Sequence, residues 1–211
     1  MHHSLDFQIA LGQRLVELGQ ITCDHPVNVD AHNIKTYSRK AMKQSFIAQE
    51  DHYGKAIRTF YSQDQASKKP LIALAAYSGA TVSQMTHRLA HLTRTILGRD
   101  FLLVADKEWY CGQLIQELHA QYGVSVLTPV KSSPKRQHEF DAVPLEQYDK
   151  TIWGNVATLY TTMTHFDGPL RMLLKKRRDG KYFALITPAI DMTPDIAMPT
   201  YEILEEFDHS V

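Results

Sequence analysis

The apolar run FLLVA, residues 101–105, lies between two segments with helical spacing, and this arrangement constrains the fold more than any other feature. From Thr81 to Leu97 apolar side chains recur every three or four residues, and Gly98 is placed to end that helix. Residues 111–122 repeat the pattern and are followed by a glycine. Strands that are joined through helices run parallel. We therefore expect FLLVA to lie parallel to its neighbours in a mixed α/β fold.

Further strands are predicted on both sides of this unit. PVNVDAH (26–32), GKAIRTFYSQ (54–63), KKPLIALAAYSG (68–79) and VSVLTPV (124–130) are short runs rich in apolar and β-branched residues. Residues 5–18 predict a short amphipathic helix, whereas the polar stretch 33–46 is interpreted as a loop. The order is then three strands, helix, strand, helix and strand.

The pattern changes after residue 131. Residues 132–150 contain two prolines and predict a long surface loop. Three strand-like runs follow, at 157–166, 169–178 and 181–188, with FDG and RDG between them as hairpin turns. They predict an antiparallel meander. Residues 191–199 are interpreted as a proline-rich connector, and Tyr201 as the start of a helix.

Composition narrows the functional classes. Lys+Arg and Asp+Glu balance at 23 each, which disfavours a module that only binds DNA, since such a module needs local basic patches. The two cysteines, Cys23 and Cys111, form no zinc signature and no disulfide framework, so we expect a reducing compartment. No apolar stretch approaches the roughly 20 residues that a bilayer requires. We expect a soluble, cytoplasmic protein.

Two aspartates stand at or near strand ends. Asp30 lies at or near the end of the first predicted strand, and Asp106 follows FLLVA directly. A single aspartate after a strand is more often a turn former or a helix cap, but two on this strand order favour a shared site. Two adjacent carboxylates repel each other, and bound Mg²⁺ resolves that repulsion. Two such ions about 3.5–4 Å apart can promote phosphodiester displacement.

These segments resemble the acidic blocks of DDE-type insertion-sequence transposases. VNVDAHNIKTYSRK is similar to the first block, and FLLVADKEWYCGQLIQELHAQYGVSVLTPVK to the second and more specific one. The resemblance implies an RNase H-like catalytic core at 26–131, a β-rich insertion at 132–190, and the start of a C-terminal core helix at 191–211, with residues 1–25 as an N-terminal helical segment. It also implies strand cleavage and strand transfer on transposon ends and target DNA, with two Mg²⁺ or Mn²⁺ ions at Asp30 and Asp106.

The third acid departs from the family pattern. The family places a glutamate on a helix after the insertion, and here Glu205 and Asp208 are the candidates, with an acidic solvated helix face as the alternative. No matching later lysine is present, so we expect a truncated copy. The resemblance implies a homo-oligomer for the full-length protein and a nucleoid-associated location.

Basic and aromatic residues near the two aspartates are candidate DNA contacts. They are Lys35, Arg39, Lys40, Lys43, Lys107 and Trp109, with a solvated loop as the alternative for the first four and a core position as the alternative for the tryptophan. Two other functions stay open beside transposition. One is an RNase H-like nuclease, and the other is an inactive remnant that binds DNA or a partner chain.

Overall fold

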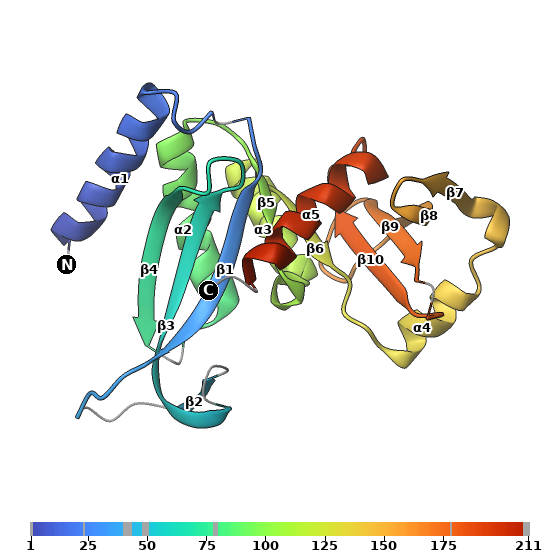
Figure 1. Ribbon diagram of the computed structural model, residues 1–211, viewed down its shortest axis with the longest axis horizontal. Helices are drawn as coiled ribbons and strands as arrows, with labels where there is room; N and C mark the ends of the chain where they lie inside the picture. The colour runs from blue at the N-terminus through green and yellow to red at the C-terminus, as the bar shows by residue number, and fades with distance from the viewer. Residues whose placement is uncertain are drawn as a thin grey trace. The chain divides into compact units, whose positions relative to one another are not determined.

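The computed structural model describes residues 2–22, 24–39, 44–47, 51–77, 80–177 and 179–208. The chain divides into two compact units, residues 1–101 and 102–211 (Figure 1). Among the described residues, no helix is long and apolar enough to cross a membrane.

The first unit combines two helices with antiparallel strands. Its elements are α1 (His2–Glu17), β1 (Val27–Lys35), β2 (Gln44–Ile47), β3 (His52–Asp64), β4 (Pro70–Tyr77) and α2 (Val82–Leu97). The long strand β3 pairs with β1 and with β4, and its first residues pair with β2. Helix α2 packs on β3 and β4, and α1 packs on α2 and β4.

Helix α2 begins and ends where its sequence signals stand. Thr81 and Gln84 form a reciprocal capping box at its start. Gly98 ends it in the left-handed conformation, at φ 70°, and donates its N–H to the carbonyl of Arg94. One side of the helix is buried, including Leu89 and Ile96, so the amphipathic spacing is used to cover the sheet.

The second unit is built on one parallel strand pair that an antiparallel meander extends. Its elements are β5 (Leu102–Val104), a 3₁₀ turn (Lys107–Trp109), α3 (Gly112–Tyr122), β6 (Ser125–Pro129), α4 (Pro134–Asp141), a second 3₁₀ turn (Leu145–Gln147), β7 (Tyr148–Thr151), β8 (Gly154–Thr161), β9 (Leu170–Lys176), β10 (Tyr182–Thr187) and α5 (Pro194–Asp208). Strand β5 runs parallel to β6, and β10 pairs antiparallel with the other edge of β6. The meander therefore continues the sheet in the order β6, β10, β9, β8, β7.

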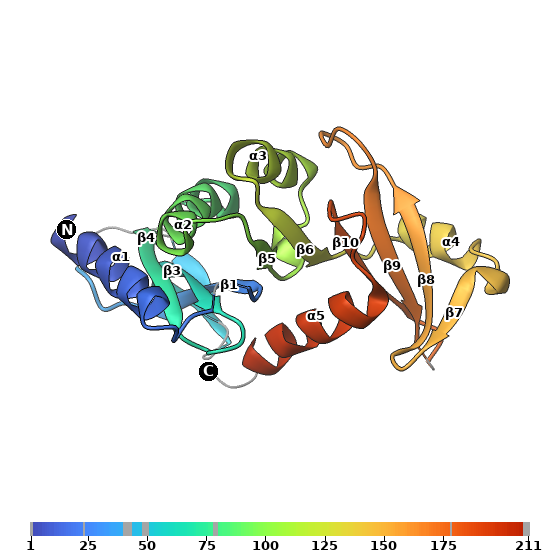
Figure 2. The ribbon, with the colours of Figure 1, turned by 90° about the horizontal axis from the view of Figure 1, so that it is seen from above.

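Helices α3 and α5 lie on opposite faces of the β5–β6 pair (Figure 2). On the α5 face, a buried cluster joins Val104 and Leu127 of the strands to Ala197, Met198 and Tyr201 of the helix. The helix is therefore held on the sheet by apolar packing, which is the main source of helix stability in proteins.

The expected fold class is confirmed. The order of three antiparallel strands, a helix, a strand, a helix and a parallel strand is that of an RNase H-like fold, with an antiparallel insertion following it. FLLVA lies parallel to the next strand, as helix-bearing connections predict. Three of the four strands of the insertion, β8, β9 and β10, with turns at Gly168 and Gly180 in the positive-φ region, also match the expectation, whereas β7 was expected to be part of a loop.

Three local predictions were wrong. The first strand does not end near Asp30 but continues to Lys35, because residues 33–35 pair with residues 56–58 of β3, and part of the expected loop is the strand β2. The expected loop 132–150 contains α4, which starts at the capping residue Ser133 with Pro134 in the first turn. Most of the expected connector 191–199 is helical, because α5 begins at Pro194.

Candidate active site

Asp30 lies in the middle of β1, where β3 supplies its main contact. Its carboxylate is 17% exposed, and Oδ2 accepts a hydrogen bond from the Tyr61 hydroxyl at 2.9 Å. Tyr61 is the residue opposite Asp30 in the β1–β3 register. Oδ1 accepts the backbone N–H of Ala31 at 2.6 Å. The carboxylate is therefore held in one orientation on a rigid strand.

His32 completes a cluster around Asp30. Two residues along the same strand, its side chain projects to the same face as that of Asp30. Its Nε2 lies 3.1 Å from Asp30 Oδ2 and 3.0 Å from the Tyr61 hydroxyl, and its ring stacks on that of Tyr61. Neither His32 nor Tyr61 was among the residues predicted for the site. His32 could have been found from its i+2 spacing, whereas Tyr61 could be found only from strand register.

Asp106 follows β5 and caps the 3₁₀ turn after it. Its Oδ1 accepts the backbone N–H of Glu108 at 2.7 Å. Its own carbonyl accepts a hydrogen bond from the Thr128 hydroxyl at 2.7 Å, and the backbone N–H of Ala105 bonds to Leu127. These contacts from β6 fix the chain on both sides of Asp106. Asp106 is thus a capping residue, as the alternative interpretation predicted. Capping does not exclude metal binding by the same carboxylate, because a carboxylate has several acceptor positions.

Carboxylate oxygens are the ligands that Mg²⁺ and Mn²⁺ prefer, so each aspartate suits a divalent cation. An ionised carboxylate has about four acceptor positions, and the contacts of Asp30 use three of them. Asp30 belongs to the first unit and Asp106 to the second. Within the described part of the chain, no group of three or more His, Cys, Asp and Glu side chains is arranged to hold a metal ion. A joint site for the two aspartates stays a prediction.

The two candidates for the third acid, Glu205 and Asp208, lie on α5. Their side chains are outside the described part of the structure. The helix itself packs against β5 and β6, the strand pair that leads into Asp106. Its start at Pro194 rather than Tyr201 gives this packing two additional turns.

The predicted DNA contacts have different environments. Lys107 and Arg39 are exposed, and the ammonium group of Lys35 lies over the ring of Tyr37, 5.3 Å from its centroid. Trp109 is only 1% exposed, so its indole is a core side chain, which is the alternative interpretation, and cannot stack on a base in this conformation. Lys40 and Lys43 lie outside the described residues.

Comparison with solved structures shows a likeness in fold. The chain is similar to the piggyBac transposase in its synaptic complex with hairpin DNA, with a TM-score of 0.58 and 14% sequence identity. The match covers 93% of this chain and 43% of the transposase chain, so the chain spans less than half of that protein. At this identity the likeness shows the fold alone.

A second similarity is too weak to bear on the fold. It is to endonuclease V of Ciona intestinalis bound to a DNA containing inosine followed by a ribo-adenosine, with a TM-score of 0.36, 9% identity, and coverage of 88% of this chain and 82% of the other. No protein-family model matches the sequence. No curated protein matches it either.

Proposed function

We propose that the chain is the catalytic region of a DDE-type DNA transposase, which cleaves and joins DNA strands and in which Asp30 and Asp106 would hold the divalent cations that this chemistry needs. The observation that carries the proposal is the position of the two acids within an RNase H-like order of elements. Asp30 is on the first strand, and Asp106 comes directly after the strand that follows α2. The likeness in fold to a transposase bound to DNA supports the same class.

The chemistry follows from the two carboxylates. Divalent cations, when bound, would neutralise charge on the scissile phosphate and activate the attacking oxygen. The task of the protein is then to hold its carboxylates still, because preorganised ligands do not have to be reoriented during the reaction. Tyr61 and His32 do this for Asp30, and the turn at Glu108 does it for Asp106.

A third acid on α5 would complete the set. Tyr201 is buried, and its ring contacts that of Phe183 on β10. The candidates Glu205 and Asp208 follow Tyr201 by four and seven residues on the same helix. A carboxylate from this helix would add a third oxygen ligand for a divalent cation.

The test is a nicking assay on supercoiled plasmid DNA with Mn²⁺. We expect the wild-type protein to nick and Asp30→Asn and Asp106→Asn each to lose about a hundredfold or more in rate, because each removes a ligand charge. Asp149→Asn is the matched control, since Asp149 is an exposed aspartate on β7. Joining of a labelled oligonucleotide to the plasmid distinguishes a transposase from a nuclease that only cleaves.

Two results would refute the proposal. One is nicking by both aspartate variants at the rate of the Asp149→Asn control. The other is equal affinity for Mn²⁺, measured by calorimetry, in the wild type and in both variants. DNA binding without any nicking by the wild type would instead favour the inactive remnant.

A further inference from the structure

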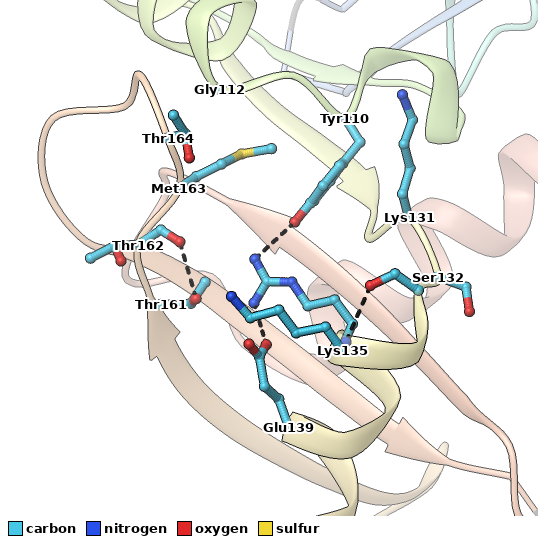
Figure 3. Close-up of a pocket in the computed structure, with 12 residues that line it drawn as sticks. Tyr110, Gly112, Lys131, Ser132, Lys135, Glu139, Thr161, Thr162, Met163 and Thr164 are labelled. Atoms are coloured by element: carbon cyan, nitrogen blue, oxygen red, sulfur yellow. Dashed lines mark hydrogen bonds and ion pairs between the residues drawn. The ribbon is translucent and has the colours of Figure 1, made fainter.

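A pocket of about 700 Å³ lies in the second unit, where α3 and α4 begin (Figure 3). Tyr110 and Gly112 form the α3 side of it, residues 131–133, 135, 136 and 139 form the α4 side, and residues 161–164 at the end of β8 close it. None of these residues belongs to the acidic site described above. The pocket walls are therefore an independent feature of the fold.

The charge of the lining is positive. Lys131, Lys135 and Arg136 line the pocket together with a single acidic residue, Glu139, so the formal net charge of the lining is plus two. Arg136 is already oriented, because it donates to Glu139 at 2.8 Å and to the Tyr110 hydroxyl at 3.3 Å (Figure 3). Within the described residues, neither lysine has a hydrogen bond or an ion pair. Their ammonium groups are thus available to an anion.

The sequence of α4 places its cations where they are unfavourable without a ligand. Lys135 and Arg136 lie in the first turn of α4, and that turn contains no acid. Cations at a helix N-terminus oppose the helix dipole, whereas an anion bound there is stabilised. The first turn of α3, on the opposite wall, also lacks an acid. An anion in the pocket would offset the unfavourable interaction of these cations with the helix dipole.

Residues 161–164 pack closely against the start of α3. A Cβ atom on Gly112 would lie 2.1 Å from the carbonyl oxygen of Thr164, so only glycine permits this approach. Ser132, Thr161 and Thr162, which carry hydroxyl groups, are also among the lining residues. Hydroxyl and ammonium donors together are the groups that bind phosphate oxygens in protein–DNA contacts.

The pocket lies at the same edge of the sheet as Asp106. Strands β5 and β6 are parallel and paired, with Val104 opposite Leu127. Asp106 follows β5 and Lys131 follows β6, so both segments leave the sheet at the carboxyl ends of these strands. A strand of DNA that reached Asp106 would bring its neighbouring phosphates toward this edge.

We propose that this pocket binds a phosphate group of a DNA strand beside Asp106, with Lys131, Lys135 and Arg136 as the contacts. The choice of DNA as the source of the phosphate rests on the proposed function, whereas the preference for a phosphate anion rests on the pocket alone. A free phosphate ion shares the same chemistry, and the experiment separates the two sources.

The experiment measures binding of a short fluorescein-labelled DNA duplex by the full chain in EDTA, over a series of KCl concentrations. We expect Lys131→Gln combined with Lys135→Gln to weaken binding about tenfold and to reduce the slope of log affinity against log salt by about 0.9, as the loss of one neutralised phosphate requires. Lys150→Gln combined with Lys181→Gln is the control, since both residues are exposed, lie outside the pocket and change the charge equally. We expect less than a twofold change for it.

Each outcome decides the proposal. Equal weakening by the pocket pair and the control pair would overturn it, because general charge would then explain the effect. Calorimetry with inorganic phosphate tests the second source. If Lys131→Gln combined with Lys135→Gln abolished phosphate binding but left the affinity for DNA unchanged, the pocket would bind free phosphate and the proposal that it binds DNA would be overturned. Because EDTA removes divalent cations, this binding assay does not depend on the proposed metal site. If Asp30→Asn and Asp106→Asn nicked DNA like the control, the binding result would still stand. A negative binding result would likewise leave the result of the nicking assay unchanged.

Discussion

At the scale of single residues, the environment of Asp30 illustrates how a strand pair prepares a carboxylate. Tyr61 is 31 positions away in the sequence and yet donates to Asp30, because the antiparallel register puts the two opposite each other. His32 reaches the same oxygen from the same strand. The cluster restricts the rotation of the carboxylate, which is what a metal ligand requires from its neighbours.

A second tyrosine makes a prediction about pH. Burial raises the pKa of Tyr148, and the nearby Tyr182 and Asp141 raise it further. Its hydroxyl has no hydrogen bond among the described residues. Because the folded state disfavours the phenolate, Tyr148 contributes stability that is present below its ordinary pKa of 10.0 and is lost as the pH rises above that value.

We therefore expect Tyr148→Phe to leave the free energy of unfolding at pH 7 unchanged or to raise it by up to about 1 kcal/mol, since it removes an unpartnered hydroxyl. Above pH 10 the variant should lose less stability than the wild type. Thermal unfolding across the alkaline range measures both effects, with Tyr160→Phe, at an exposed tyrosine of β8, as the control. Identical alkaline profiles for the wild type and Tyr148→Phe would contradict the prediction.

At the scale of elements, α3 depends on one glycine at its first residue. Gly112 is buried, and the loop after β8 passes so close that a methyl group would overlap the carbonyl of Thr164. The contact is with backbone, which cannot rotate away as a flexible side chain can. The start of α3 and the loop 161–164 are therefore fixed relative to each other.

Gly112→Ala should lower the free energy of unfolding by about 2–3 kcal/mol, because the added carbon forces a backbone shift. Urea unfolding followed by circular dichroism is the measurement. Gln121→Ala, at an exposed position of the same helix, should change the stability by less than about 0.5 kcal/mol. A Gly112→Ala protein as stable as that control would mean that the loop does not hold this position.

At the scale of the whole molecule, the proposed role of Asp30 and Asp106 as metal ligands predicts how cations affect stability. A ligand that binds only the folded state raises its stability in proportion to the logarithm of ligand concentration. If cation binding needs both carboxylates, as proposed, Mn²⁺ should stabilise the protein only when both are present.

At an Mn²⁺ concentration of about 100 times Kd, the wild type should gain about 2.7 kcal/mol of stability and show a higher Tm. Asp30→Asn and Asp106→Asn should each remove most of the gain, whereas Asp149→Asn should keep it. Differential scanning calorimetry with and without Mn²⁺ tests this. If each variant retained half of the gain, the two aspartates would bind separate ions and the shared site would be rejected.

The sequence by itself determined the main elements and their order. Apolar spacing located α1, α2 and α3, Gly98 and Gly123 marked where two helices end, and the apolar run 101–105 gave the parallel strand before Asp106. These features are local, since capping residues and periodicity act within a few positions. The same local signals at Ser133 and Pro134 were present and were overlooked.

Tertiary structure alone decided what each element contacts. Cross-strand pairing extended β1 to Lys35 and brought Tyr61 to Asp30, although nothing near either residue in the sequence indicates the other. Packing on β5 and β6 made a helix of the proline-containing segment from Pro194, and three distant segments met to form the phosphate pocket. Register and packing depend on residues far apart in the chain, so local pattern cannot specify them.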